Sequence, residues 1–406
     1  MKNQIVFLML ILISASVFAQ QMMGPPAGDY VFKGEDGVIE IPFQLIQNHV
    51  ILTADLNGGN SVKLVLDTGM PAHGAMLYKT KQIEDLNLKF SGQAMVGGAG
   101  GELKPADILM GASLSFPGLE FNGIDIVILP HDEISRRVFT SHDGVIGYSF
   151  FSRFVMEFDF EKMILKVIEP DKFDSTGKGT EIPIEIVHNS PFITCYPTLQ
   201  DGTRKTVKMI LDMGGTHAVS LDSNEDEKIV PPSKTLIRKA AGVGGEFDVI
   251  QGRIKSFEIG NYKLNNVIAS FSDLAMGKMQ GSRSNSNLGM EILTRFNFTI
   301  DYKGTRIFLK PNIHFDRAFE TNMSGIRYYR DENENLVVEA IIDDSPAFEI
   351  GLRATDIITK IDGKTSAEID TNDLIEIFQH EGKTLELTIK RDGIEIMKKL
   401  KLRRLI

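Results

Sequence analysis

The chain has 406 residues, and its most constraining feature is an internal repeat. Blocks of the first half recur in the same order, and at nearly constant spacing, in the second half. Self-similarity of this kind predicts two copies of one folded unit. The matching blocks are residues 40–43 with 181–184, 62–69 with 207–214, 96–98 with 243–245, 147–154 with 289–296, and 158–160 with 300–302.

Both copies have the sequence texture of β-structure. Their segments are short, rich in valine, isoleucine and phenylalanine, and separated by glycine, asparagine and aspartate, which is typical of strands joined by turns. We expect a mainly β fold of two tandem lobes related by a pseudo-twofold axis, with short helices near 79–86 and 150–154. The expected boundaries are a signal peptide at 1–19, lobe one at 20–175, lobe two at 176–315 and a further domain at 322–406.

Two aspartates occupy the same place in the two copies. Asp67 and Asp212 each end an apolar strand, and a glycine two residues later permits a tight turn and close approach of another main chain. If the lobes pack about a twofold axis, the two turns meet there with the carboxyl groups about 3 Å apart. Like charges that close cannot both ionise, so one carboxyl keeps a proton while the other acts as a base toward water. The alternative is that each aspartate only bonds the backbone of its own turn.

The segment 64–69 resembles the active-site loop of the pepsin/retropepsin clan, and residues 96–101 and 144–147 resemble bacterial retropepsin-like aspartyl proteases. The resemblance extends over about residues 38–312 and occurs twice. It implies pepsin/retropepsin-like β-barrel lobes and an aspartic endopeptidase that needs neither metal nor cofactor. The residues it assigns are Asp67 and Asp212 as the catalytic pair, with Thr68, Gly69, Met213 and Gly214 in the active-site loops.

The second copy departs from that family pattern. Met213 stands where the family usually has a threonine or serine, whose hydroxyl links the two loops. Asn287 takes the place that apolar Val145 holds in the first copy, in a segment that packs behind the catalytic loop in the family. Met70 and Pro71 follow the first loop, where pepsin-type enzymes carry a hydroxyl residue. Met213 is the departure that favours an alternative, a catalytically degenerate protein of the same fold that holds peptides without cutting them.

Glycine-rich segments lie in both copies at equivalent places. They allow two interpretations, flexible hairpins that close over a bound peptide or ordinary β-turns. A phosphate-binding loop is a poor interpretation, because no Lys-Ser/Thr pair follows. The candidate flap residues are Gly97, Gly98, Gly100, Gly101, Gly244 and Gly245.

After Thr321 the sequence resembles a small α+β domain, the bacterial protease-associated PDZ domain, over about residues 322–406. The resemblance rests on the run 345–352 followed by Asp-Ile-Ile at 356–358. PDZ domains bind an extended peptide end as an added strand, so the resemblance implies a C-terminal peptide ligand beside the peptide or protein substrate. It assigns Gly325 and Ile326 to the carboxylate loop, and Leu374 and Phe378 to the neighbouring helix. Alternatively, these apolar residues fill the domain core.

The N-terminus has the features of a secretory signal peptide. Lys2 precedes the apolar run 5–13, and small residues suit cleavage after Ala19. That run is too short to span a bilayer, and no other stretch approaches the necessary length. We therefore expect a secreted or periplasmic protein without a membrane span.

Charge and the less common side chains exclude further functions. The net charge is −10, and basic residues cluster only at 398–404, in the expected last strand. This charge distribution argues against nucleic acid as a partner. Cys195, the single cysteine, lies in an expected strand and is interpreted as a buried structural thiol, with a nucleophile as the alternative. His73 and His217, one after each aspartate, are a weak metal pattern and are interpreted as wall or surface residues.

Overall fold

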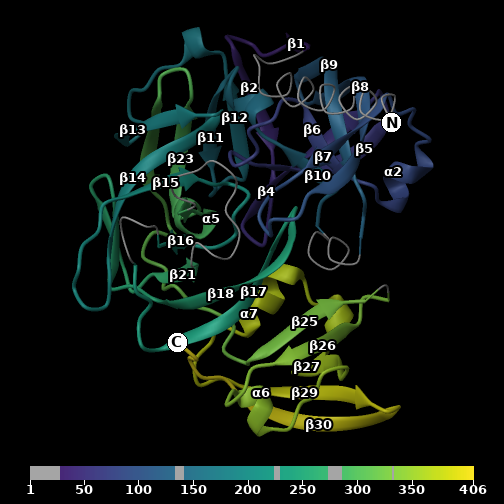
Figure 1. The fold of residues 1–406 in the computed structure, drawn as a ribbon, viewed down its shortest axis with the longest axis vertical. Coiled ribbons are helices and arrows are strands. Elements are labelled where there is room, and N and C mark those ends of the chain that lie inside the picture. The colour runs from purple at the N-terminus through teal and green to yellow at the C-terminus, as the bar shows by residue number, and fades with distance from the viewer. Residues whose placement is uncertain (1–27, 133–140, 224–228, 273–285, 332) are drawn as a thin grey trace, which may run out of the picture. The chain divides into compact units, whose positions relative to one another are not determined.

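The computed structural model describes residues 28–132, 141–223, 229–272, 286–331 and 333–406. The chain divides into two compact units, the first extending to Arg317 and the second from Ala318 to Ile406. Strands dominate both units, which confirms the predicted mainly β class (Figure 1). The predicted signal peptide, residues 1–19, lies outside the described residues. In the part of the chain that is described, no helix has both the length and the apolar character needed to cross a membrane.

The two halves of the first unit have matching series of short strands (Figure 1). The first half contains β1 (Asp29–Phe32), β2 (Val38–Pro42), β3 (Gln44–Ile46), β4 (His49–Leu56), β5 (Asn60–Leu66), β6 (Ala75–Tyr78), α2 (Lys81–Asp85), β7 (Gly92–Val96), β8 (Lys104–Phe116), β9 (Leu119–Leu129), β10 (Gly144–Ile146), α4 (Tyr148–Phe151), β11 (Val155–Asp159), β12 (Ile164–Ile168) and η1 (Pro170–Lys172). The second half contains β13 (Thr180–Val187), β14 (Ser190–Thr198), β15 (Val207–Leu211), β16 (Val219–Asp222), β17 (Thr235–Gly242), β18 (Gly245–Arg253), β19 (Ser256–Ile259), β20 (Tyr262–Asn265), β21 (Ile268–Ser272), β22 (Asn287–Leu288), α5 (Met290–Leu293), β23 (Phe296–Asp301) and β24 (Arg306–Pro311).

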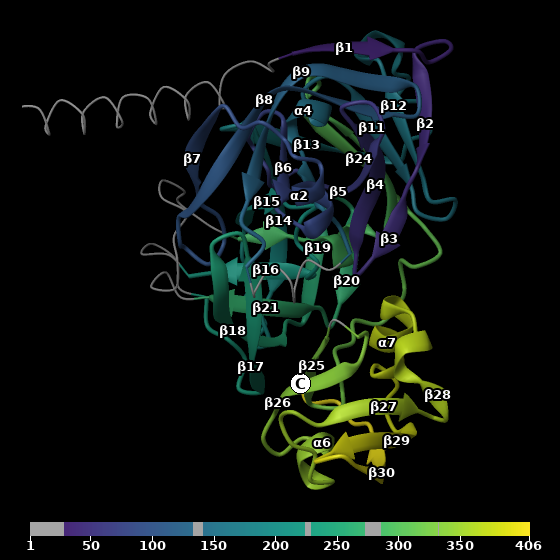
Figure 2. The ribbon, with the colours of Figure 1, turned by 90° about the vertical axis from the view of Figure 1, so that its right-hand side faces the viewer.

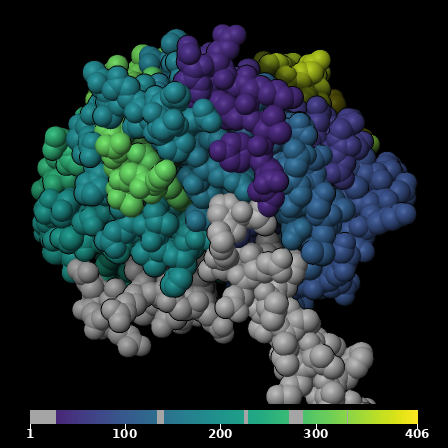
Figure 3. Space-filling view, turned by 90° about the horizontal axis from the view of Figure 1, so that it is seen from above, coloured from purple at the N-terminus to yellow at the C-terminus, as the bar shows by residue number. Residues whose placement is uncertain are grey.

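One sheet joins the halves. At its centre, three strands of the first half are followed by the three equivalent strands of the second half in reverse order. The order is β2-β12-β11-β23-β24-β13, in which β2, β12 and β11 are the repeat equivalents of β13, β24 and β23. At its centre β11 and β23 are antiparallel, with Phe158 opposite Phe298 and their ring centroids 4.5 Å apart. Both rings are buried, so the halves share apolar core at the pseudo-twofold axis. Figure 3 shows the residues of the two halves packed side by side.

The strands that carry the two aspartates end in the same way in both halves. β10 lies parallel to β5 and antiparallel to β6, and β22 lies parallel to β15 and antiparallel to β16. The N–H of Asp67 donates to Ile146 O at 2.9 Å, and the N–H of Asp212 donates to Leu288 O at 2.9 Å. The apolar-Gly segment of each repeat therefore fixes the point at which each aspartate leaves its strand.

The second unit is a small α+β domain (Figure 2). Its antiparallel sheet has the order β25-β26-β27-β29-β30, with β28 paired to β27. Ser345 caps α6 by accepting the N–H of Phe348, and Pro346 occupies the first turn, where no intrahelical donor is needed. The elements are β25 (Ile326–Arg330), β26 (Leu336–Ile341), α6 (Pro346–Glu349), β27 (Ile357–Ile361), β28 (Lys364–Thr365), η3 (Ser366–Glu368), α7 (Thr371–Ile377), β29 (Thr384–Arg391) and β30 (Ile394–Lys401).

Candidate active site

The two repeated aspartates meet in one site. The backbone N–H of Gly214 donates to Oδ1 of Asp67 at 2.9 Å and to Oδ1 of Asp212 at 3.1 Å. A single nitrogen thus lies within hydrogen-bond distance of a carboxyl oxygen from each half. Gly69 N–H adds a further bond to Asp67 Oδ1 at 2.6 Å. The two side chains therefore form one paired group rather than two separate turns.

Glycine is required at both loop positions because the carboxyl groups occupy the space of a side chain. A Cβ on Gly69 would lie 2.9 Å from Asp212 Oδ1 and 3.0 Å from Asp67 Oδ1. A Cβ on Gly214 would lie 2.5 Å from Asp67 Cγ. The Asp-x-Gly pattern of each copy is thus explained by the close approach of the other copy.

The surroundings of Asp67 favour the protonated form of its carboxyl group. Burial, and after it the negative charge of Asp212, raise the pKa of Asp67 to about 7 despite the opposing effect of the N–H bonds from Gly69 and Gly214. A carboxyl with this pKa holds its proton at weakly acidic pH. One proton shared between two adjacent carboxyl groups is the arrangement that an acid–base pair needs.

Thr68 links the two loops through one buried hydroxyl. Its Oγ1 donates to Leu211 O at 2.5 Å and accepts the N–H of Met213 at 2.9 Å. Met213 is itself completely buried, and its thioether cannot return an equivalent pair of bonds. The link therefore runs from the first loop to the second only, as the sequence departure at Met213 predicts.

Two asparagines that the sequence analysis missed bind the loops from outside. Asn48 Nδ2 donates to Thr216 O at 3.0 Å, and Asn189 Nδ2 donates to Pro71 O at 3.0 Å. Each asparagine lies in the hairpin turn of one half, with a left-handed φ of 66° or 67°, and contacts the loop of the other half. The two asparagines occupy equivalent positions in the repeat, and this equivalence was the feature of the sequence that could have identified them. Next to Asn48, His49 Nε2 donates to Gly214 O at 3.1 Å.

Asn287 reaches the dyad itself. It lies in β22, where its backbone pairs with Ile210, and its Nδ2 donates to Asp212 Oδ2 at 3.0 Å. The equivalent Val145 in β10 packs in an apolar cluster instead. The polar departure noted in the sequence thus places an amide donor directly on a carboxyl oxygen of the pair.

Of the two histidines after the aspartates, expected at a wall or surface, His73 is buried and His217 is half-buried. His73 is only 3% exposed and its ring lies 5.0 Å from that of Tyr148. His217 lies against the second loop, where Nε2 is buried and burial lowers its pKa. Among the described residues no group of three or more His, Cys, Asp or Glu side chains is arranged to hold a metal ion. Cys195 is completely buried in β14 and burial raises its thiol pKa, so it is a structural thiol.

The two glycine-rich hairpins contact each other at their tips. Gly244 N–H donates to Ala99 O at 2.8 Å, and Glu102 N–H donates to Gly244 O at 3.1 Å. A Cβ on Gly100 would lie 2.5 Å from the backbone of Gly244, so the tips meet main chain to main chain. The candidate flap glycines lie here, with Gly97, Gly98, Gly100 and Gly101 between β7 and β8, and Gly244 and Gly245 at the turn between β17 and β18.

The hairpin tips also pack on the apolar surroundings of the dyad. Val96 and Val243, from the two hairpins, contact the buried cluster that contains Val145. Met70, three residues after Asp67, contacts the same cluster. The hairpins and the loop after Asp67 therefore contact the same apolar cluster.

In the second unit the candidate peptide-binding residues are mostly core. Ile326, Leu374 and Phe378 are all buried within its apolar cluster. Gly325 has a φ of 78° just before β25. The ring of Tyr328 in β25 lies 5.8 Å from that of Phe378, the residue that follows α7.

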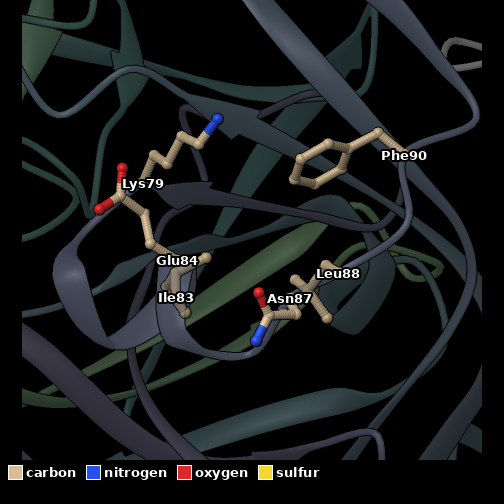
Figure 4. Close-up of a pocket in the computed structure, with 6 residues that line it drawn as sticks. All are labelled: Lys79, Ile83, Glu84, Asn87, Leu88 and Phe90. Carbon is tan, nitrogen blue, oxygen red and sulfur yellow. The ribbon is translucent and has the colours of Figure 1, made fainter.

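A separate hollow of about 310 Å³ lies beside α2 (Figure 4). Lys79 lines it, with Nζ 5.4 Å from the centre of the Phe90 ring and 3.4 Å from Asp107 Oδ2. Neither aspartate of the dyad lines it, so it is not part of the candidate active site. Its lining residues are Lys79, Ile83, Glu84, Asn87, Leu88 and Phe90.

Comparison with known proteins agrees with this architecture. Residues 52–150 and 198–292 match the aspartyl protease family model, and residues 337–391 match a PDZ domain model. The chain thus contains two regions that match the aspartyl protease family, followed by a region that matches a PDZ domain. Comparison with curated proteins gives no match. A solved structure described as photosystem II D1 C-terminal processing protease is 18% identical over 23% of this chain and 26% of that chain, with a TM-score of 0.20.

Proposed function

We propose that this protein is an aspartic endopeptidase in which Asp67 and Asp212 act as one catalytic dyad. The observation that carries the proposal is the single Gly214 N–H shared by Oδ1 of both aspartates. The pKa of about 7 for Asp67 supports it, because a working dyad holds one proton between two carboxyl groups.

The reaction follows from that one shared proton. The ionised carboxylate takes a proton from water, whose oxygen attacks the peptide carbonyl carbon, while the protonated carboxyl gives its proton to the carbonyl oxygen. In the second step the newly protonated carboxyl protonates the amide nitrogen, the other carboxylate takes a proton from a hydroxyl of the gem-diol, and the C–N bond breaks. A carboxylic acid and an amine leave, and the dyad returns to its starting state.

The substrate we propose is an extended peptide held beneath the paired hairpins. The tip-to-tip contacts between Ala99, Glu102 and Gly244 support this, since they make a cover that must open to admit a chain. The PDZ domain suggests peptide binding, and we propose that it holds a peptide end or a protein partner. We also propose that the protein acts outside the cytoplasm, as a secreted or periplasmic protein, on the basis of the leader sequence 1–19.

One feature supports the alternative of a peptide-binding protein without activity. Met213 supplies no hydroxyl to the loop of Asp67, so the link between loops is one-sided. The bonds from Asn48 and Asn189 favour the enzyme, because each holds the aspartate loop of one half against the hairpin turn of the other half without that hydroxyl.

Incubation of the purified full chain with a mixed peptide library from pH 3 to pH 9 tests the proposal. We expect cleavage at defined internal bonds, identified by mass spectrometry. The Asp67→Asn variant, purified identically, shows whether a contaminating peptidase is responsible. Binding of peptides by the wild type without cleavage at any pH would contradict the enzyme and favour the alternative.

A further inference from the structure

Three N–H donors serve the dyad, and each aspartate accepts two bonds, but on different sets of oxygens. Gly69 and Gly214 both donate to Oδ1 of Asp67, whereas Asp212 receives Gly214 on Oδ1 and Asn287 on Oδ2. Both oxygens of Asp212 therefore accept N–H bonds. Among the described residues no N–H donates to Oδ2 of Asp67. Asp67 Oδ2 is therefore the carboxyl oxygen on which no N–H donor disfavours the shared proton.

We propose that Asn287 is a positioning residue that keeps Asp212 as the ionised base of the dyad and Asp67 as the acid. A donor on a carboxylate oxygen stabilises the charged form and opposes protonation there. The inference rests on the proposed peptidase function and adds to it the direction in which the proton moves. Asp212 takes the proton of the attacking water, and Asp67 gives its proton to the carbonyl oxygen.

The orientation of the Asn287 amide follows from the same chemistry. An ionised carboxylate oxygen only accepts hydrogen bonds, so the amide nitrogen faces Asp212. Asn287 Oδ1 is buried and has no hydrogen-bond partner within the described part of the chain. The bond to Asp212 is therefore the one that orients this side chain, and half of the amide is left unsatisfied. A purely structural role does not explain that cost, since Val145 fills the equivalent place without it.

The elements around the pair contribute other titratable groups. His49 and His217 interact with Asp212, and Tyr78 and Tyr302 interact with Asp67. Burial lowers the pKa of both histidines and raises the pKa of both tyrosines. The tyrosines therefore do not titrate in acid, and the histidines are the groups to be controlled in a test.

The test compares wild type with Asn287→Val, the residue of the first copy. We expect the acidic limb of kcat/KM against pH to move up by about one pH unit, with about tenfold lower kcat/KM on the acidic side, because the ionised base loses its donor. The same shift is expected in His49→Gln and His217→Gln backgrounds. A limb that does not move, or that moves only when a histidine is present, would overturn the proposal.

A second measurement keeps this inference separate from the proposed function. The bond from Asn287 stabilises the folded protein only while Asp212 is ionised, so its contribution is present at higher pH and is lost as the pH falls. The Tm of wild type relative to Asn287→Val should therefore rise with pH through the acidic range, even in a preparation that cleaves nothing. A constant Tm difference at all pH values would show a merely structural role. Absence of cleavage together with the expected Tm trend would contradict the peptidase and leave the assignment of Asn287 supported.

Discussion

Replacing Asp212 by asparagine is expected to lower kcat/KM for peptide cleavage by about 10³-fold or more, the loss also expected for Asp67→Asn. The amide has the shape of the carboxyl group but cannot accept a proton from water. Both aspartates receive N–H bonds from Gly214, so neither half is expected to act alone. Cleavage of one peptide by the wild type and each variant, with folding checked by circular dichroism, measures the effect.

The matched control is Asp201→Asn. Asp201 lies in an exposed turn of the same half, where its Oδ1 accepts the N–H of Thr203. This variant should cleave at the wild-type rate. A mixture of Asp67→Asn and Asp212→Asn should stay inactive, because each chain builds its own site. Activity that survives Asp212→Asn but not Asp67→Asn would contradict the single-chain dyad, and would point to pairing of first halves between two molecules.

Thr68→Val is expected to destabilise the first unit by about 2–4 kcal/mol. Valine has nearly the same shape, but it leaves Leu211 O without a donor and Met213 N–H without an acceptor, and Thr68 is only 1% exposed. Buried groups that lose a partner each cost about 1–3 kcal/mol. Scanning calorimetry suits the measurement, because the chain has no tryptophan to report unfolding by fluorescence.

Thr68→Ser is the control for this prediction, because it keeps the hydroxyl and removes only a methyl group. Its loss should be smaller, about 1 kcal/mol. If the serine variant were as unstable as the valine variant, the methyl contacts and not the two hydrogen bonds would hold the loops. Equal stability of wild type and Thr68→Val would show that the two hydrogen bonds of Thr68 do not stabilise the joining of the halves.

The repeat carried most of the information about the fold. It predicted two similar halves, and the apolar strands ending at Asp67 and Asp212 indicated which residues could meet at their axis. Strand period and turn residues are local properties, so they can be read along the chain. The pairing of Phe158 with Phe298 across the axis is a long-range register, which sequence texture alone does not specify.

The parts of the site that escaped prediction depend on contacts between the halves. Asn48 and Asn189 look like ordinary turn residues, and only the packed structure brings them to the opposite loops. Asn287 was visible as a polar exception, but its contact with Asp212 depends on the position of β22. His73 is an exception within one half: it was expected at a wall or surface, and it is buried with its ring 5.0 Å from that of Tyr148.

The pH dependence of kcat/KM for a cleaved peptide shows whether Asp67 and Asp212 work as a pair that shares one proton. A pair that shares one proton gives a bell-shaped profile, since activity is lost when both carboxyl groups are protonated and when both are ionised. The upper limb should fall near pH 7, where Asp67, with a pKa of about 7, loses its proton. A profile that stays flat or rises from pH 7 to pH 9 would contradict the account, because the acid it requires would already be ionised.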